Sequence, residues 1–182
     1  MPAEIEMYLA SIGVEYQRWT RVQPIPSTHS AEEILRVYQP ELDRYRASKK
    51  FSGYDVVDLT PDTPGLEEML REFRREHWHD SLESHFILAG RGVCNVHPSG
   101  RPVATVELEP GDLISIGCGV RHWFDLCAEK RFRAIRFVSE DEDRIIGYTG
   151  SGIEADYEPV CMGLAYFPLK AARPARETSH SY

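Results

Sequence analysis

Apolar positions at helical spacing mark the first part of the chain. Ser30 and Glu33 have the spacing of a helix-capping box. The apolar residues that follow recur every three or four positions: Ile34, Leu35, Tyr38, Leu42 and Tyr45. This periodicity predicts an amphipathic helix. Pro40 lacks an N–H donor, so we expect it to kink this helix or to split it in two.

A short strand and a second helix are predicted before the middle of the chain. Residues 54–59 (YDVVDL) form a β-prone run, and Pro61 and Pro64 interrupt the chain after it. A second set of apolar residues again has helical spacing: Leu66, Met69, Leu70 and Phe73. We therefore expect a helical N-terminal part over about residues 30–75, with its second helix ending near Arg75.

Short β-prone runs separated by glycine and proline dominate the chain from His77 onward. The runs cover residues 84–89, 93–97, 102–108, 113–116, 122–126 and 132–138. Strands that recur about every 8–12 residues indicate a β-sandwich or barrel, which we place at about residues 76–140. We expect residues 141–182 to form a tail that wraps around this barrel and frays after Lys170.

The composition fits one globular domain with no affinity for nucleic acid or membranes. The 182 residues suffice for one core, and the net charge of -8 disfavours a sequence-independent contact with nucleic acid. No apolar run approaches the roughly 18 residues needed to cross a bilayer, and the acidic N-terminus lacks a secretion signal. The four cysteines are scattered, which favours reduced thiols. We expect a cytoplasmic monomer or small homo-oligomer.

Residues 77–83 (HWHDSLE) are the strongest candidate for chemistry. Side chains two residues apart on a strand face the same side, so His77 and His79 present their imidazoles together. A short turn can bring the Glu83 carboxylate back to them. Neutral imidazoles and one carboxylate suit a divalent first-row metal ion with open coordination positions. A fourth ligand must come from elsewhere, and His122 is the natural candidate, because the strands before it can fold back over this motif.

The motifs around these residues are similar to the two motifs of the cupin superfamily. The matching residues are His77, His79, Glu83 and Gly90 in the first motif, and Gly111 and His122 in the second. This resemblance implies a small jelly-roll barrel, also called a double-stranded β-helix, that holds a metal ion with three histidines and one glutamate. We therefore expect a mainly β cupin fold with helices at the N-terminus.

Four further segments make the chain resemble the bacterial acireductone dioxygenases: residues 112–115 (DLIS), 122–125 (HWFD), 132–136 (FRAIR) and 148–150 (YTG). The likeness extends roughly from Gly13 to Tyr157. It implies an Fe(II) or Ni(II) dioxygenase of methionine salvage, with one ion per chain, that cleaves a chelating enediol with O2. In that family the iron form yields a 2-keto acid and formate, and the nickel form releases carbon monoxide.

The resemblance also implies roles for single residues. The metal ligands are the four residues named above for the metal ion: His77, His79, Glu83 and His122. Arg136 corresponds to an arginine near the substrate, and Phe124 to an aromatic wall of the substrate pocket.

Two positions depart from the family's pattern and leave the substrate open. Where the family has arginine two residues after the glutamate, this chain has His85, and Arg144 replaces a tryptophan. Arg144 can compensate for the lost charge, with acireductone still the substrate. Alternatively the substrate has changed, to a cysteine-like thiol or an amino acid. A third interpretation is a non-catalytic sensor, but the acidic first 75 residues do not resemble a DNA-binding domain.

Overall fold

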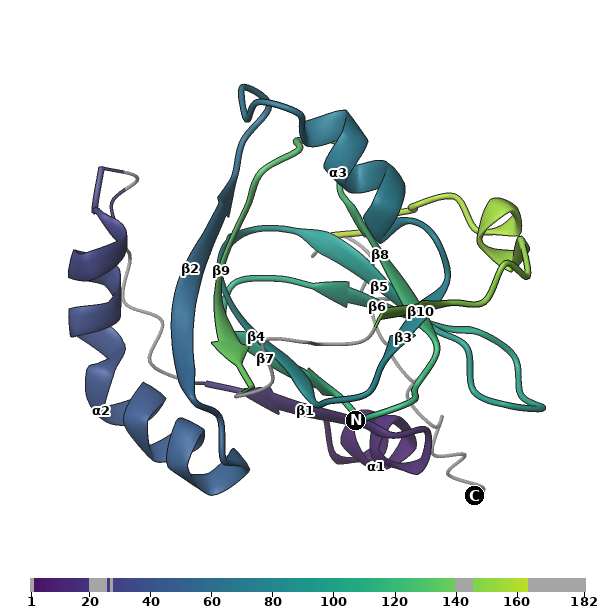
Figure 1. Ribbon diagram of the computed structural model, residues 1–182, viewed down its shortest axis with the longest axis horizontal. Helices are drawn as coiled ribbons and strands as arrows, with labels where there is room; N and C mark the ends of the chain where they lie inside the picture. The colour runs from purple at the N-terminus through teal and green to yellow at the C-terminus, as the bar shows by residue number, and fades with distance from the viewer. Residues whose placement is uncertain (1, 20–25, 27, 140–145, 164–182) are drawn as a thin grey trace, which may run out of the picture.

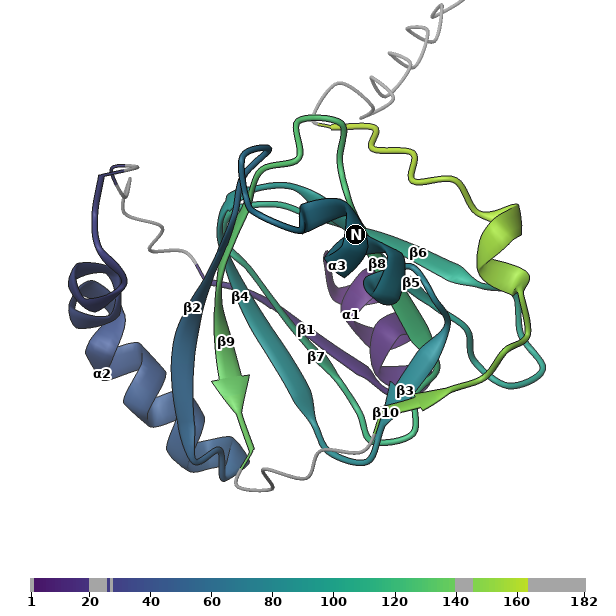
Figure 2. The same ribbon diagram turned by 45° about the horizontal axis from the view of Figure 1, so that its top comes forward.

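Two five-stranded antiparallel sheets face each other and enclose the interior of the molecule (Figures 1 and 2). The computed structural model describes residues 2–19, 26, 28–139 and 146–163. The first sheet contains, in spatial order, β1 (Val14–Arg18), β7 (Asp112–Ile116), β4 (Glu83–Gly90), β9 (Phe132–Val138) and β2 (Gly53–Leu59). The second contains β10 (Ile146–Tyr148), β3 (His77–His79), β8 (His122–Leu126), β5 (Gly92–Val96) and β6 (Ala104–Leu108).

The strand-rich second half predicted from the sequence is confirmed, and the sheets extend beyond it. The predicted strand at residues 54–59 is β2, and it forms one edge of the first sheet beside β9. The opposite edge is β1, which the sequence pattern did not reveal. Strand β10 adds an edge to the second sheet. Chain segments outside residues 76–140 therefore complete both sheets.

Among the described residues, three α-helices lie around the sheets (Figure 1). Helix α1 (Pro2–Ser11) precedes β1, and helix α3 (Leu66–Phe73) contacts β8 at one end of the barrel. Helix α2 (Ala31–Lys49) begins at the predicted capping box, in which Ser30 and Glu33 bond to each other's backbone N–H groups. Pro40 lies inside α2, and the helix continues through it as one element. Of the two expected outcomes, a kink or a split, the split at Pro40 does not occur.

Alternation along the strands separates two apolar clusters. In β9, Ala134 belongs to the cluster between the two sheets, whereas Ile135 and Phe137 point to the opposite side and pack against α2. Helix α2 contributes its four buried residues to this outer cluster: Ile34, Tyr38, Leu42 and Tyr45. The first sheet is thus covered by α2 on its outer face. Its inner face is left to line the barrel interior.

The segment after β10 is held against the barrel. It contains a short 3-10 helix (Ile153–Asp156), and Tyr157 then packs edge-on against Trp123, with ring centroids 5.7 Å apart. A disulfide joins Cys127 to Cys161, so the expectation that all cysteines are reduced was wrong for this pair. Two cysteines far apart in sequence meet here because the chain returns to the second sheet. The fraying expected after Lys170 lies outside the described residues.

No helix among the described residues is long and apolar enough to cross a membrane.

Candidate metal centre

Strands β3 and β8 bring three histidines together. His77 and His79 are two residues apart on β3 and face the same way, and His77 is the cross-strand partner of His122 on β8. The imidazole centroids lie 5.0 Å apart for His77 and His79, 4.5 Å for His77 and His122, and 5.3 Å for His79 and His122. One ring nitrogen of each lies within 4.8 Å of the other two. A single ion can contact all three.

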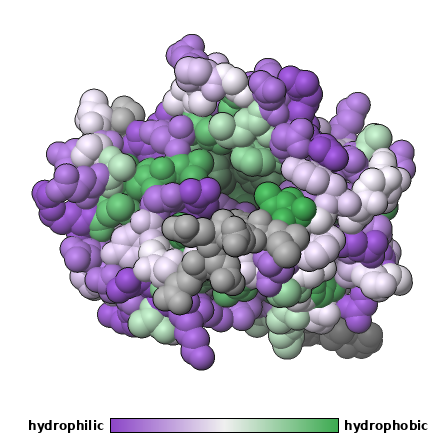
Figure 3. All heavy atoms as spheres, in the orientation of Figure 1, coloured by the Kyte–Doolittle hydropathy of each residue, from purple (hydrophilic) through white to green (hydrophobic). Residues whose placement is uncertain are grey.

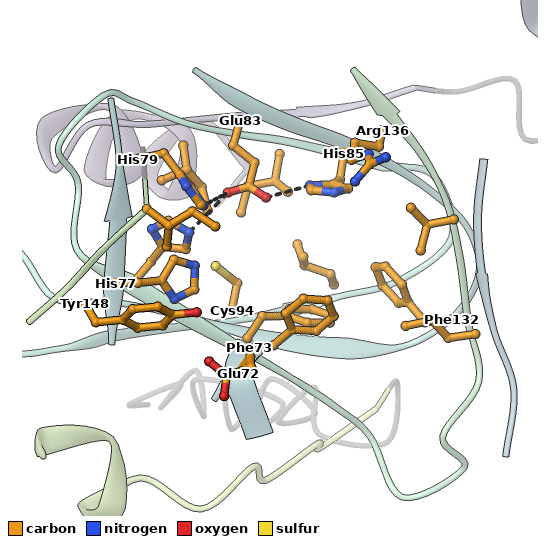
Figure 4. Close-up of a pocket in the computed structure, with 18 residues that line it drawn as sticks. Glu72, Phe73, His77, His79, Glu83, His85, Cys94, Phe132, Arg136 and Tyr148 are labelled. Carbon is orange, nitrogen blue, oxygen red and sulfur yellow. Dashed lines mark hydrogen bonds and ion pairs between the residues drawn. The ribbon is translucent and has the colours of Figure 1, made fainter. Parts of the chain in front are cut away.

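Glu83 reaches the histidines from the opposite sheet. It is the first residue of β4, and its Oε2 lies 3.0 Å from His79 Nε2 and 3.2 Å from His122 Nε2. The turn between β3 and β4 is the point at which the chain crosses from the second sheet to the first. The four residues predicted as ligands therefore converge, with the carboxylate against two of the three imidazoles (Figure 4).

Backbone carbonyls orient two of the imidazoles. His77 donates its Nδ1–H to the Arg75 carbonyl at 2.7 Å, and His122 donates its Nδ1–H to the Val120 carbonyl at 2.8 Å. With the proton on Nδ1, Nε2 of each ring carries a lone pair. This is the arrangement of metal-binding histidines, whose second nitrogen is held by a hydrogen bond.

The charge state of the cluster suits a divalent cation. Burial, and next the proximity of His122, lowers the pKa of His77 to about 4, so its imidazole is neutral at pH 7. Burial acts to raise the pKa of Glu83, but the close contacts of its carboxylate with His122 and His79 outweigh burial and hold that pKa well below its usual value. An ionised carboxylate beside buried imidazoles is the donor set of first-row metal sites. The residues present fit a resident metal ion.

A largely apolar cavity of about 350 Å³ opens from the cluster into the barrel interior. Side chains of both sheets and of α3 line it, among them Leu59, Phe73, Ile114 and Phe132. In the orientation of Figure 1, the surface shows a hollow bordered by apolar residues (Figure 3). The polar groups gather at the histidine end and along one wall (Figure 4). A small molecule with a chelating head and an apolar tail matches this division.

Three of the four residues predicted to contact substrate line the cavity, and the fourth lies outside the described residues. His85 and Arg136 are cross-strand partners on β4 and β9, and both line the cavity, as does Phe124. His85 Nδ1 lies 3.8 Å from Glu83 Oε1, the carboxylate oxygen other than the one that faces the histidines. Arg144 lies outside the described residues.

Sequence reasoning missed several groups around the cluster. Glu76 is only 1% exposed, and it accepts hydrogen bonds from His97 Nδ1 at 2.5 Å, from Ser151 Oγ at 2.6 Å and from Thr149. His97, which precedes Pro98 in a turn-like segment of the sequence, is partly buried in this network. The only sequence signal for this network is an acidic residue directly before His77. Its partners, however, come from distant turns.

The comparisons with known proteins place this chain beside one family. The model of the ARD/ARD' family matches residues 6–145. The chain is 38% identical over 150 residues to the acireductone dioxygenase of Xylella fastidiosa strain 9a5c, covering 82% of this chain and 79% of that protein. It is 35% identical over 165 residues to the acireductone dioxygenase of Aquifex aeolicus strain VF5, covering 89% and 90% respectively.

A solved structure shows the same arrangement of elements. The acireductone dioxygenase from Bacillus anthracis, with a cadmium ion in its active centre, superimposes with a TM-score of 0.70 at 31% identity. The match covers 78% of this chain and 87% of that one. It confirms the cupin fold expected from the sequence.

Proposed function

Because this chain belongs to the ARD/ARD' family, we propose that it cleaves an acireductone with dioxygen in methionine salvage. It is a metal-dependent dioxygenase that acts on a small molecule and O2. The observation that carries the proposal is the convergence of three buried histidines and Glu83 at one end of an apolar cavity.

We assign the resident ion as iron(II), with nickel(II) as the alternative, at one ion per chain. The three Nε2 atoms and Glu83 Oε2 would hold it, leaving open coordination positions toward the cavity. When bound, the ion supplies a positively charged centre that two neighbouring oxygens of an enediolate can chelate. One carboxylate ligand does not cancel a divalent charge, so an anionic substrate is favoured.

The cavity walls would orient the rest of the substrate. Arg136, on the cavity wall beside the histidines and Glu83, can donate a hydrogen bond to a substrate oxygen. The methylthio tail of an acireductone is apolar, and it fits the region lined by Phe124, Phe132 and their aliphatic neighbours. Filling this region with the tail would exclude water from the head group.

The proposal is tested by product analysis. The metal-free protein, loaded with iron(II) or with nickel(II), is given acireductone and oxygen, and loss of substrate is followed with the products. We expect rapid consumption by both forms, with formate and a 2-keto acid from the iron form and carbon monoxide from the nickel form. Consumption no faster than that in buffer containing the same metal would contradict the proposal.

A second candidate substrate class is favoured by one observation, the presence of His85 on the cavity wall where the resembling enzymes have arginine. A histidine cannot offer the permanent fork of donors that arginine gives an anion, but it can bond a substrate amine or thiol. A cysteine-like thiol or an amino acid is then the substrate. Oxygen uptake by the iron form with cysteine, in the absence of uptake with acireductone, would favour this candidate.

A further inference from the structure

Three polar side chains form a row across the inner face of the first sheet. Asp55 on β2 stands opposite Arg136 on β9, and Arg136 stands opposite His85 on β4. Directly opposed residues on neighbouring antiparallel strands project from the same face. Val57 and Leu59 follow Asp55 at intervals of two and line the cavity, which identifies this face as the inner one. The row ends at His85, two residues from Glu83.

Asp55 holds Arg136 with a two-pronged contact. Arg136 Nε donates to Asp55 Oδ1 at 3.1 Å, and Arg136 Nη2 donates to Asp55 Oδ2 at 2.5 Å. Such a fork fixes the plane of the guanidinium as well as its distance. The fork uses Nε–H and one N–H of Nη2, so Nη1 and the second N–H of Nη2 can meet a substrate. Figure 4 shows Arg136 beside His85 at the edge of the cavity.

The same contact cancels charge in the cavity wall. Asp55 and Arg136 are nearly half exposed, at 46% and 43%, so their ion pair contributes little to folding stability. Its consequence lies in the site. An unpaired guanidinium at position 136, one strand farther from Glu83 than His85, would attract the oxygens of an anionic substrate away from the metal ion. Paired with Asp55, Arg136 is a directed hydrogen-bond donor with little net charge.

We propose that Asp55 is a positioning residue for the reaction: it orients Arg136 and neutralises it, so that the metal ion alone attracts the anionic head of the substrate. This inference rests on the proposed function, because it takes the substrate as an anion that chelates the metal. The proposal gives the edge strand β2 a role in the site. The spacing of the metal ligands in the sequence does not indicate this role.

The same two strands provide a matched control. Asp58 on β2 is the cross-strand partner of Arg133 on β9, and the two side chains form an ion pair in which Nε and Nη2 of Arg133 both donate to Asp58 Oδ2, Nε at 2.8 Å. Asp58 is three residues beyond Asp55, so this pair projects from the outer face. Neither residue lines the cavity. Asp58→Asn therefore removes an equivalent charge from the same strand without altering the site.

The first experiment compares kcat and KM for acireductone in iron-loaded wild type, Asp55→Asn and Asp58→Asn. In Asp55→Asn the freed guanidinium should bind substrate in an unproductive orientation. We expect kcat to fall about tenfold while KM stays the same or falls severalfold. Asp58→Asn should keep both constants. Equal kinetic constants in the two variants, or a rise in KM without a fall in kcat for Asp55→Asn, would overturn the proposal.

A binding measurement separates this inference from the proposed function. Acetohydroxamate, an anionic chelator, is titrated into nickel-loaded protein and followed by absorption. It should bind severalfold tighter to Asp55→Asn than to wild type or Asp58→Asn, whatever the natural substrate. Asp55→Glu restores the negative charge on a longer side chain, so it should return chelator affinity to the wild-type value while kcat stays low. Unchanged or weaker chelator binding by a folded Asp55→Asn protein would overturn the role of Asp55. Failure of wild type to consume acireductone would overturn only the proposed function.

Discussion

The orientation of two metal-site histidines is encoded within three residues of chain. In each case the carbonyl that accepts the Nδ1–H belongs to the residue two positions earlier, Arg75 for His77 and Val120 for His122. A local bond of this kind selects the tautomer whose Nε2 lone pair points away from the backbone. The barrel then has only to bring β3 and β8 together. The site is thus assembled from two short segments that are each already arranged to bind a metal.

His85→Arg tests the substrate at the residue scale. Arginine would place a permanent cation and forked donors on the wall beside Glu83 and Arg136. If acireductone is the substrate, turnover by the iron-loaded variant should equal or exceed that of wild type, with unchanged metal content. His29→Arg adds the same charge away from the cavity lining and should have no effect. Absence of acireductone turnover in wild type, together with loss of activity on the native substrate in a metal-retaining His85→Arg protein, would favour a changed substrate.

The sequence allowed the element types to be predicted where the side chains alternate or repeat. Residues 77–83 and His122 were identified because a metal site needs particular residues at particular intervals. Strand β1 was missed because it carries few apolar residues, and only its backbone pairing with β7 makes it a strand. The fork between Asp55 and Arg136 was missed for a related reason. The pairing register of β2 with β9 is set by the whole sheet and not by either strand's own pattern.

Glu76 connects three segments that are far apart in the sequence. Its carboxylate joins the start of β3 to the β5–β6 turn through His97 and to the segment after β10 through Thr149 and Ser151. Strand β10 has only three residue pairs with β3, so these contacts help to keep the edge of the cavity in place. The segment that contains β10 is therefore held largely by side-chain hydrogen bonds to Glu76, because its pairing with the sheet is short.

Glu76→Gln should therefore destabilise the protein. The amide retains an acceptor oxygen but introduces an NH2 group among partners that donate to a carboxylate, and it removes the charge. We expect the free energy of unfolding to fall by about 1–3 kcal/mol, measured by urea denaturation. Glu68→Gln, at an exposed position of α3, should change it by less than about 0.5 kcal/mol. Equal stability of the two variants would show that the Glu76 network does not anchor β10.

At the scale of the whole molecule, the two faces of the first sheet have different roles. Its outer face carries the aromatic and aliphatic cluster under α2, and its inner face carries the cavity wall. The second sheet supplies the histidines and receives the C-terminal segment on its outside. The three histidines and Glu83 lie where the two sheets meet, at the β3–β4 crossing. Both sheets must therefore be in place for Glu83 to meet the histidines.

The disulfide between Cys127 and Cys161 should stabilise this arrangement. The two residues are 34 positions apart, and closing a loop of this length restricts the unfolded chain, which stabilises the fold by about 2–4 kcal/mol. Urea denaturation of Cys161→Ser should show a loss of that size. Cys118→Ser changes an exposed thiol outside the histidine group, and it should retain both stability and metal. Identical midpoints for wild type under reducing and non-reducing conditions would contradict a stabilising disulfide.

The most direct test of the metal-dependent oxygenase is a titration of the metal-free protein with iron(II) while acireductone-dependent oxygen uptake is recorded. We predict that wild type takes up no oxygen above the rate in buffer until iron is added, and that the rate then rises linearly and levels off at one ion per chain. His122→Ala removes one of the three converging imidazoles and should show no such rise. Uptake by the metal-free wild type, or a His122→Ala protein that saturates at the same stoichiometry and rate, would contradict the account.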